Sequence, residues 1–402
     1  MFSLGYDLKD IDYIINAYGT SNLKEDSLYN KVRKMYECLI VMGYTNEEII
    51  YMTKNFPALY SLDVSNIKQK IIDLINIGHS HDGVMKITKN NPSIFGFNID
   101  NIKNKIEYLL KLKYSKKETL KMIETYSRLY NLNVSKINRR INDLLELGYS
   151  NEAIMKMTKI VPKLYGLDLL NIKNKILFMQ SLGFSKEDML KISVSFPGIY
   201  TVSSDNIKNK IDNLISIGYK NKSIVKMCVC CPQIFSLGIE NIKNKINELI
   251  LLGYSYDDVI KLTSASARIL ALGIDNVKEK IKILKSLGYT TNEIITITTC
   301  FPAIFNLSID TLTEKIEFYN SIGLRRVFVL YPKRLMQGVD LSYARYMFYK
   351  ENGKEINENN YNMLFISQNK FYKLYHIEKE ELIEKYNFDR DKNDLDKQKR
   401  LS

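Results

Sequence analysis

The sequence repeats itself at an interval of 35 residues, and this recurrence restricts the possible folds more than any other feature of the chain. The hexapeptide NIKNKI begins at Asn101 and returns unchanged at Asn171, Asn206 and Asn241. A fixed period of this length is typical of solenoids, in which one repeat has too little core to fold alone and stacks against its neighbours. We therefore interpret the 402 residues as a repeat array rather than as separate globular domains.

Glycine and proline markers follow the same interval. A glycine in the phrase Leu/Ile-Gly-Tyr/Phe should end a helix, because glycine adopts a left-handed C-terminal cap without strain. The positions of this glycine are Gly43, Gly78, Gly148, Gly183, Gly218, Gly253, Gly288 and Gly323. Lys113 stands at the one missing place, where we expect it to weaken its repeat. All seven prolines follow a second marker, and only Pro332 is off register, by five residues.

The segment after each proline turn predicts a first helix. Asp100 is expected to be its N-cap, because the carboxylate can accept hydrogen bonds from the free amides of the first turn. The same position holds Ser65, Ser135, Asp205, Asp275 and Asp310 in other repeats. One apolar stripe, which we expect to be core, is predicted from the helical spacing of the following apolar residues. These residues are Ile102, Ile106, Leu109 and Leu110.

A second helix of about ten residues is predicted between the glycine and the proline. It opens with Ser or Thr, and in several repeats an acid three positions later completes a capping box or its Asp equivalent. These pairs are Thr45 with Glu48, Ser115 with Glu118, Ser185 with Asp188, Ser255 with Asp258, and Thr290 with Glu293. The predicted fold is therefore an all-α, right-handed-type α-solenoid of about nine 35-residue helix-turn-helix repeats.

Composition and segment pattern set the expected organisation of the chain. Residues 1–340 should form the repeat array, residues 341–386 a C-terminal helical cap and residues 387–402 a charged, disordered tail. No apolar run reaches the length of a membrane span, so we expect a soluble monomer without a membrane partner. Five cysteines favour a reducing compartment, and the N-terminal residues show no targeting pattern, which predicts an intracellular, cytoplasmic location.

Three columns of cations share the 35-residue interval and are the candidate nucleic-acid-binding residues, because stacked repeats turn a sequence column into a charged stripe. The first column is Lys68, Lys103, Lys173, Lys208, Lys243 and Lys278. The second column is Lys70, Lys105, Arg140, Lys175, Lys210, Lys245, Lys280 and Lys315. The third column, in the second helix, is Lys86, Lys121, Lys156, Lys191, Lys226 and Lys261. A net charge of +13 agrees with a polyanionic partner.

The first two columns cannot face the same surface. Successive residues of a helix are rotated by about 100°, so Lys103 and Lys105 flank the apolar stripe on opposite sides. One column should line the ligand-binding surface and the other a boundary between repeats, and the sequence leaves open which. Lysine lacks the rigid fork of arginine, so these columns suit phosphate contact better than guanine recognition.

The order of the markers resembles the repeat of the mitochondrial transcription termination factor (mTERF) family. The stretch FPGIY at residues 196–200, followed by IGY at 217–219 and by Pro232, matches the family's repeat, and LFISQNKF at 364–371 resembles its closing phrase. The resemblance implies two-helix repeats with a short turn, curved into a half-ring that binds duplex nucleic acid along a basic surface. It also implies a role in organellar transcription or RNA processing, and a mitochondrial or other organellar location.

We predict a non-enzymatic protein without cofactor or metal that binds double-stranded DNA and affects transcription. The three histidines have no fixed nucleophile beside them in the sequence pattern, which gives no sign of catalysis. Two alternatives stay open: an RNA-binding solenoid in RNA processing or ribosome assembly, and a protein-interaction scaffold whose lysines maintain solubility. If six lysines each neutralise one phosphate, the salt dependence of binding should have a log–log slope of about −5.

Three further sets of residues are interpreted as structural or solvent-exposed. A series that varies between repeats could read bases, although solvent exposure is the favoured explanation. This series is Gln69, Asn104, Arg139, Asn174, Asn209, Asn244, Glu279 and Glu314. An aromatic column, expected to pack between repeats, is Tyr60, Phe95, Tyr130, Tyr165, Tyr200, Phe235 and Phe305. Cys228, Cys230 and Cys231 are expected to be buried thiols, because no paired set completes four zinc ligands.

Overall fold

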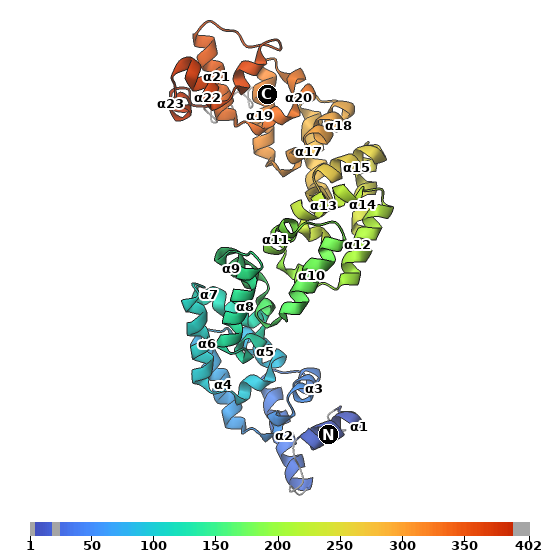
Figure 1. Ribbon diagram of the computed structural model, residues 1–402, viewed down its shortest axis with the longest axis vertical. Coiled ribbons are helices and arrows are strands. Elements are labelled where there is room, and N and C mark those ends of the chain that lie inside the picture. The colour runs from blue at the N-terminus through green and yellow to red at the C-terminus, as the bar shows by residue number, and fades with distance from the viewer. Residues whose placement is uncertain (1–4, 18–24, 389–402) are drawn as a thin grey trace. The chain divides into compact units, whose positions relative to one another are not determined.

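The computed structural model describes residues 5–17 and 25–388. Within these ranges the chain forms α-helices and short 3-10 helices without a β-strand, which confirms the predicted all-α fold (Figure 1). The chain divides into two compact units, Met1–Ser204 and Asp205–Ser402, and each is described by itself. The count of about nine repeats stays a prediction.

The first unit runs from α1 to η6. Its elements are α1 (Leu8–Ala17), α2 (Glu25–Val41), α3 (Asn46–Asn55), η2 (Pro57–Ser61), α4 (Val64–Ile77), α5 (His81–Asn90), η3 (Pro92–Gly96), α6 (Ile99–Lys111), α7 (Lys116–Thr125), η4 (Ser127–Asn131), α8 (Val134–Glu146), α9 (Asn151–Ile160), η5 (Pro162–Gly166), α10 (Leu169–Ser181), α11 (Lys186–Ser195) and η6 (Pro197–Tyr200).

The second unit begins within the first residues of α12 and ends with three short C-terminal elements. Its elements are α12 (Ser204–Ser216), α13 (Asn221–Cys230), η7 (Pro232–Phe235), α14 (Ile239–Leu251), α15 (Tyr256–Ala265), α16 (Arg268–Ala271), α17 (Ile274–Ser286), α18 (Thr291–Cys300), η8 (Pro302–Asn306), α19 (Ile309–Ser321), α20 (Arg325–Leu330), η9 (Pro332–Met336), α21 (Val339–Glu351), η10 (Tyr361–Phe365), α22 (Gln368–Tyr375) and α23 (Lys379–Lys385). The predicted tail lies outside the described residues from position 389 on.

The first helix of the repeat begins two residues earlier than predicted. The side chain of Asn98 caps α6 by accepting a hydrogen bond from the backbone amide of Asp100, so Asp100 lies in the first turn and the N-cap prediction was wrong. The Asp100 carboxylate is suited to that turn as well, because it faces the positive end of the helix dipole. The N-cap residues of equivalent helices are Asp63, Asn133, Gly273 and Ser308.

The turn glycines behave as predicted. All eight adopt a positive φ, between 74° at Gly323 and 121° at Gly78. Lys113 adopts the same left-handed conformation, with φ of 70°, although its side chain disfavours it. The turn geometry is therefore imposed by the repeat even where glycine is missing.

The second helices also follow the sequence signals. Eight of them are ten residues long, and seven of these are separated by one residue from a 3-10 turn; α15 is followed instead by the short helix α16. Reciprocal capping boxes form at the pairs Thr45 with Glu48, Ser115 with Glu118, Ser185 with Asp188, and Thr290 with Glu293. Ser255 caps its helix by accepting from the amide of Asp258. The predicted second helix is confirmed.

The core lies between the two helices of each repeat and the turn that follows. Ile102, Ile106 and Leu109 are buried, whereas Leu110 is 38% exposed, so the prediction of Leu110 as a core residue was wrong. Its position is rotated by about 80° from Ile102, toward the exposed edge of the helix. The predicted aromatic column is buried throughout, which confirms its packing role.

Buried hydroxyl groups connect neighbouring repeats. The Tyr114 hydroxyl lies 2.6 Å from Thr158 Oγ1 and 2.7 Å from the Tyr165 hydroxyl, 44 and 51 positions later. The pairs with the same separation of 44 positions include Tyr44 with Thr88, Tyr149 with Ser193, Tyr219 with Thr263, and Tyr254 with Thr298. Because these donors and acceptors are buried, each bond fixes the distance between repeats.

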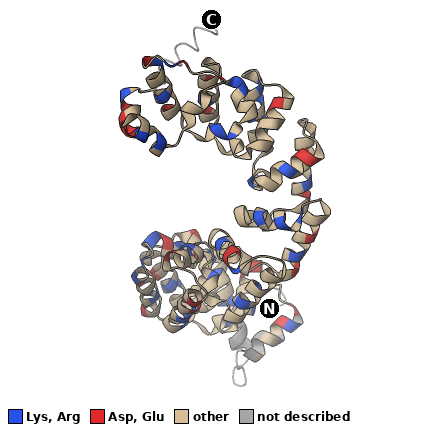
Figure 2. Ribbon diagram, turned by 45° about the horizontal axis from the view of Figure 1, so that its top comes forward, with Lys and Arg blue, Asp and Glu red and all other residues tan. Residues whose placement is uncertain are grey.

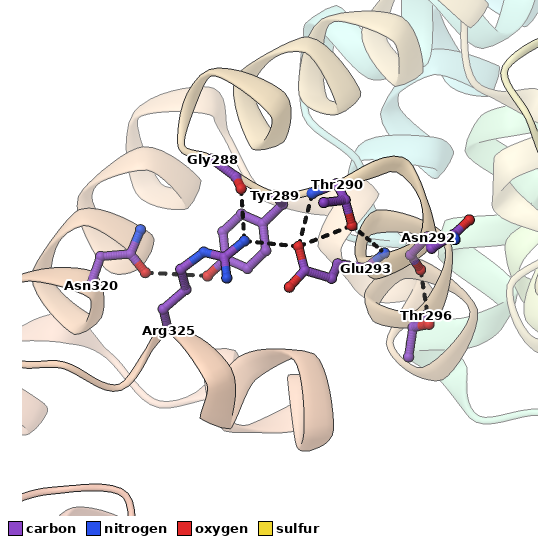
Figure 3. Close-up of polar contacts among 8 residues, drawn as sticks. All are labelled: Gly288, Tyr289, Thr290, Asn292, Glu293, Thr296, Asn320 and Arg325. Carbon is purple, nitrogen blue, oxygen red and sulfur yellow. Dashed lines mark hydrogen bonds and ion pairs between the residues drawn. The ribbon is translucent and has the colours of Figure 1, made fainter.

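The off-register proline follows a shortened second helix. α20 has six residues, whereas the second helices of other repeats have ten. The Tyr289 hydroxyl donates to Asn320 Oδ1 at 3.3 Å, where the tyrosines of other repeats have a threonine or serine as partner. The Arg325 guanidinium lies 4.7 Å from the centre of the Tyr289 ring and donates to Glu293 Oε2 and to the carbonyl of Gly288 (Figure 3). Asn320 therefore takes the place of the threonine as the partner of the hydroxyl, and Arg325 adds a cation–π contact to the ring.

Replacing Lys113 by glycine should stabilise the protein. A residue with a side chain pays a conformational cost in the left-handed region, and glycine does not. The free energy of unfolding should rise by about 0.5–1 kcal/mol after the greater entropy of glycine in the unfolded chain is subtracted. The matched control is Gly183→Lys, because Gly183 has a φ of 94° and no atom within 4 Å of an added Cβ. Thermal unfolding should show a higher Tm for Lys113→Gly and a lower Tm for the control; an unchanged or lower Tm for Lys113→Gly would contradict the prediction.

Candidate nucleic-acid interface

The repeated hexapeptide contains lysines in two different environments. In α6, Lys103 and the two asparagines are exposed, whereas Lys105 and the two isoleucines are buried. The two lysine columns of the first helix therefore have different roles. Figure 2 shows Lys and Arg on the helices of both units, with Asp and Glu between them.

The second column joins each repeat to the next through hydrogen bonds. The Lys175 amino group donates to the carbonyl oxygen of Val202 at 2.7 Å, and that of Lys70 donates to the carbonyl of Phe97 at 2.5 Å, both 27 positions later. The same separation is found for Lys105 to Leu132, Arg140 to Leu167 and Lys210 to Leu237, whereas Lys280 donates to Phe305, 25 positions later, and Lys315 to Leu335, 20 positions later. Each acceptor lies in the last two residues of a 3-10 turn or within two residues after it.

Burial changes the chemistry of these cations. It lowers their pKa, because a charged group loses hydration inside the protein. The groups with a lowered pKa are Lys70, Lys105, Arg140, Lys210, Lys280 and Lys315. Lys245 is buried as well, and its amino group lies 3.4 Å from the Glu248 carboxylate. The second column thus occupies the boundary between repeats, and we leave its residues out of the proposed interface.

The first column is exposed on the first helices. Its lysines lie on α4, α6, α10, α12, α14 and α17. Four of the six lysines have an acid three positions earlier on the same helix face, and the Lys243 amino group lies 2.9 Å from the Glu240 carboxylate. In α8 the same position holds Asn138, which accepts a hydrogen bond from Tyr108 of the preceding first helix. This column is therefore placed beside the preceding repeat, with its charge partly offset.

The third column is exposed on the second helices, which pack directly on one another. In the first unit, α5, α7, α9 and α11 are successive neighbours, and in the second unit α13 packs on α15. Their lysines form a row in each unit: Lys86, Lys121, Lys156 and Lys191 in the first, and Lys226 and Lys261 in the second. Within residues 25–388 none of these six amino groups makes a hydrogen bond or an ion pair. Packed helices lie about 8–10 Å apart, which matches about three base pairs of duplex.

Basic residues in the turns were missed by the sequence reasoning. Arg128 in η4, Lys163 in η5 and Arg268 at the start of α16 are exposed directly beyond the second helices that carry the third column. The signal was available, because each lies at the variable position of the proline marker or at its equivalent. No acid occurs in the first turn of these three elements. We call the third column together with these three residues the second-helix surface.

Most acids of the second helices lie in the first turn, where Glu48 and Glu118 cap their own helices and pair with a lysine of the next second helix. The Lys89 amino group lies 2.8 Å from Glu48, and that of Lys159 lies 3.0 Å from Glu118 on the preceding second helix. The hydrogen bond from Lys89 lowers the pKa of Glu48, and the backbone amide of Ser115 is the main cause of the lowered pKa of Glu118. Capping and ion pairing thus engage Glu48 and Glu118. Other first-turn acids are exposed on the face of the third column, four positions before its lysines: Asp82, Glu152, Glu187 and Asp257 precede Lys86, Lys156, Lys191 and Lys261.

The variable series lies on the first helices, exposed over most of its length. Asn104 lines a groove with Asn131 and Asn133, and Arg139 lines the next groove with Asp168. These grooves are bounded by a first helix and the 3-10 turn of the following repeat. The location agrees with the favoured explanation of solvent exposure, and a role in base reading stays a prediction.

The cysteines differ in exposure. Cys228 and Cys231 are buried as predicted, but Cys230 is exposed, so the prediction was wrong for this residue. It lies at the C-terminal end of α13, in the position where α18 exposes Cys300. Burial raises the pKa of the Cys228 and Cys231 thiols. No group of three or more potential His, Cys, Asp or Glu metal ligands occurs in the described ranges.

His79 replaces tyrosine in one of the links between repeats. Its side chain is buried, with Nδ1 2.8 Å from Glu124 Oε1 and Nε2 2.9 Å from the Tyr130 hydroxyl. Burial lowers the pKa of His79, and the Glu124 carboxylate opposes that effect in part. The neutral imidazole suits this place, because one nitrogen can donate to the carboxylate while the other accepts from the hydroxyl.

Comparison with known proteins agrees with the repeat architecture. The family model described as mTERF matches residues 21–180, 113–286 and 249–371, so that its matches overlap and cover most of both units. No significant match was found among curated proteins. None of the helices in the described part of the chain combines the length and apolar character needed to cross a bilayer.

Replacing Lys105 by methionine should destabilise the protein by about 1–3 kcal/mol, because the Leu132 carbonyl loses its donor at a buried boundary. Lys103→Met is the matched control on the same helix, and its effect should stay within about 0.5 kcal/mol. Lys105→Arg should retain most of the stability, since Arg140 fills the same position in another repeat. Denaturant unfolding measures all three; equal losses for Lys105→Met and Lys103→Met would refute the role of the bond.

Stability should fall in mild acid because of His79. Because the pKa of His79 is lowered in the folded protein, the unfolded chain takes up the proton first as the pH falls. The free energy of unfolding should therefore begin to decrease near pH 6.5 and decrease further until the pH reaches the folded-state pKa. Above that range His79 contributes no pH dependence. His79→Tyr should reduce this loss, because a tyrosine takes up no proton in this pH range and its hydroxyl can still bond to that of Tyr130, whereas replacement of the exposed His81 by Gln should not. Tm measured against pH tests this, and identical profiles for His79→Tyr and the unchanged protein would disprove it.

Proposed function

The chain belongs to the mTERF family, and on that premise we propose that it binds nucleic acid, with double-stranded DNA as the ligand, and thereby affects transcription. The observation that carries the proposal is the second-helix surface. Its rows of amino groups make no hydrogen bond or ion pair within the described part of the chain and lie on helices that pack on one another, which suits contact with successive phosphates.

The second-helix surface is a better phosphate track than the first column. Second helices of neighbouring repeats pack directly, so their lysines recur at a spacing set by helix packing. The following turns add Arg128 and Lys163 in the first unit without an accompanying acid in those turns. Acids share the helix face in both columns, as at Glu240 and Lys243 on a first helix and at Glu152 and Lys156 on a second helix. The second helices are favoured because their lysines lie on directly packed helices with turn cations beyond them.

Lysine-rich contact favours affinity over sequence discrimination. An ammonium group on a flexible stem contacts phosphate as a point charge and does not fix the orientation of a base. We expect binding to differ little between duplexes of different sequence, and to weaken steeply as salt is added. Family membership favours a mitochondrial or other organellar nucleic acid as the target, and RNA is the second candidate ligand.

Neutralising the second-helix surface should weaken duplex binding and its salt dependence. In the full chain, the triple variant Lys121→Gln, Lys156→Gln, Lys191→Gln should reduce the log–log salt slope by about 3, if each lysine contacts one phosphate. The matched control is Lys68→Gln, Lys103→Gln, Lys173→Gln, which removes the same charge from first helices of the same unit. Fluorescence anisotropy with a labelled duplex, titrated at several salt concentrations, gives both slopes.

The outcomes separate the alternatives. A loss confined to the control variant would move the interface to the first helices. Equal slopes for both variants and the unchanged protein would overturn a lysine-based interface and favour a protein-interaction scaffold. Parallel titrations with duplex RNA and with single strands identify the ligand class, because tighter binding to either RNA form than to duplex DNA would favour the RNA alternative.

A further inference from the structure

The last 3-10 turn of the array presents an aromatic and cationic surface that the proposed interface does not use. Leu330, Tyr331 and Met336 flank or end η9 with 59%, 50% and 72% of their surface exposed. The five-residue shift aligns Tyr331 with Phe301, which is only 6% exposed. Large exposed apolar side chains gathered on one short segment mark a binding surface rather than a packing position.

The tyrosine is held by a preformed set of contacts between η9 and η10. The ring of Tyr331 stacks on Tyr361, with centroids 5.7 Å apart and an angle of 23° between the planes. Tyr361 meets the edge of Phe365, whose ring lies 5.0 Å from the guanidinium of Arg334. Arg334 also donates to Asn362 Oδ1 at 2.9 Å. The inner face of Tyr331 is thus fixed, while half of its surface faces solvent.

The charge of this segment suits a phosphate beside the ring. The five residues of η9, PKRLM, include two cations and no acid. Lys333 is exposed two positions after Tyr331, so its amino group can reach a phosphate attached to a group stacked on the ring. An aromatic face with an adjacent cation is the combination that binds unpaired nucleotides, because every base has a face that can stack.

We propose that Tyr331 stacks an unpaired nucleobase and that Lys333 contacts its phosphate, so that this end of the array binds single-stranded nucleotides adjoining a duplex. The inference rests on the proposed function, since the duplex would be held by the second-helix surface. The ring supplies stacking without reading the base, so the preference is for an unpaired end and not for a sequence.

The test compares a blunt DNA duplex with the same duplex carrying a three-nucleotide overhang, using the full chain. The unchanged protein should bind the overhang duplex about tenfold more tightly, which is the size of effect that one stacked base supplies. Tyr331→Ala should lose this gain while keeping its affinity for the blunt duplex, and Tyr331→Phe should retain the gain. A 2-aminopurine placed in the overhang should lose fluorescence on binding the unchanged protein and Tyr331→Phe, but not Tyr331→Ala.

The result can fail independently of the proposed function. Tight binding of the blunt duplex with no gain from the overhang would overturn the stacking site and leave duplex binding intact. A gain that persists in Tyr331→Ala would also overturn it. Weak blunt-duplex binding with a Tyr331-dependent response to the overhang would support stacking while contradicting the duplex proposal. Circular dichroism confirms that Tyr331→Ala is folded, and an RNA overhang in a parallel arm separates the two kinds of single strand.

Discussion

A buried cation that donates to the end of the next repeat's turn is the interaction on which the repeat architecture depends. The amino group meets a carbonyl 27 positions later at Lys70, Lys105 and Lys175 alike, so an insertion or deletion between the two would move the acceptor away from a buried charge. The tyrosine hydroxyl bonds impose a second fixed separation, of 44 positions. Together these bonds explain in physical terms why the interval of 35 residues is kept so strictly.

The last repeat has a different spacing but keeps the buried bond from a cation to a carbonyl. Where the second helix is shortened, the Lys315 amino group still donates to a carbonyl, that of Leu335, which is only 20 positions later. Arg345 is fully buried and donates to the carbonyls of Leu364 and Ile366, which continues the same kind of contact into the C-terminal elements. The sequence reasoning missed Arg345 because the five-residue shift removes it from the 35-residue column. A bond can therefore be retained although the register changes, provided that a buried carbonyl lies within reach.

Local signals predicted the helices well and their environment less well. The turn glycines, capping boxes and second-helix lengths depend on backbone chemistry within a few residues, and they were predicted correctly. The N-cap at Asn98 was missed because asparagine and aspartate cap equally well and both occur there. The exposure of Leu110 and the burial of Lys105 depend on which side of the helix the neighbouring repeat covers. The sequence of one helix does not show which side that is. One clue existed: the second column holds a cation in every repeat from Lys70 to Lys315, whereas the first column is interrupted.

Burial of the second column changes how the net charge bears on function. The formal charge of +13 includes eight cations that are buried within the described residues, among them Lys105 and Arg345, and these are not available to a ligand. The exposed charge is therefore smaller than the composition suggests, and a diffuse attraction to polyanions would be correspondingly weak. What remains is the arrangement of the exposed cations: a row such as Lys121, Lys156 and Lys191 lies on helices that pack on one another. Binding should then depend on the match between the spacing of the row and that of phosphates, which the buried bonds between repeats maintain.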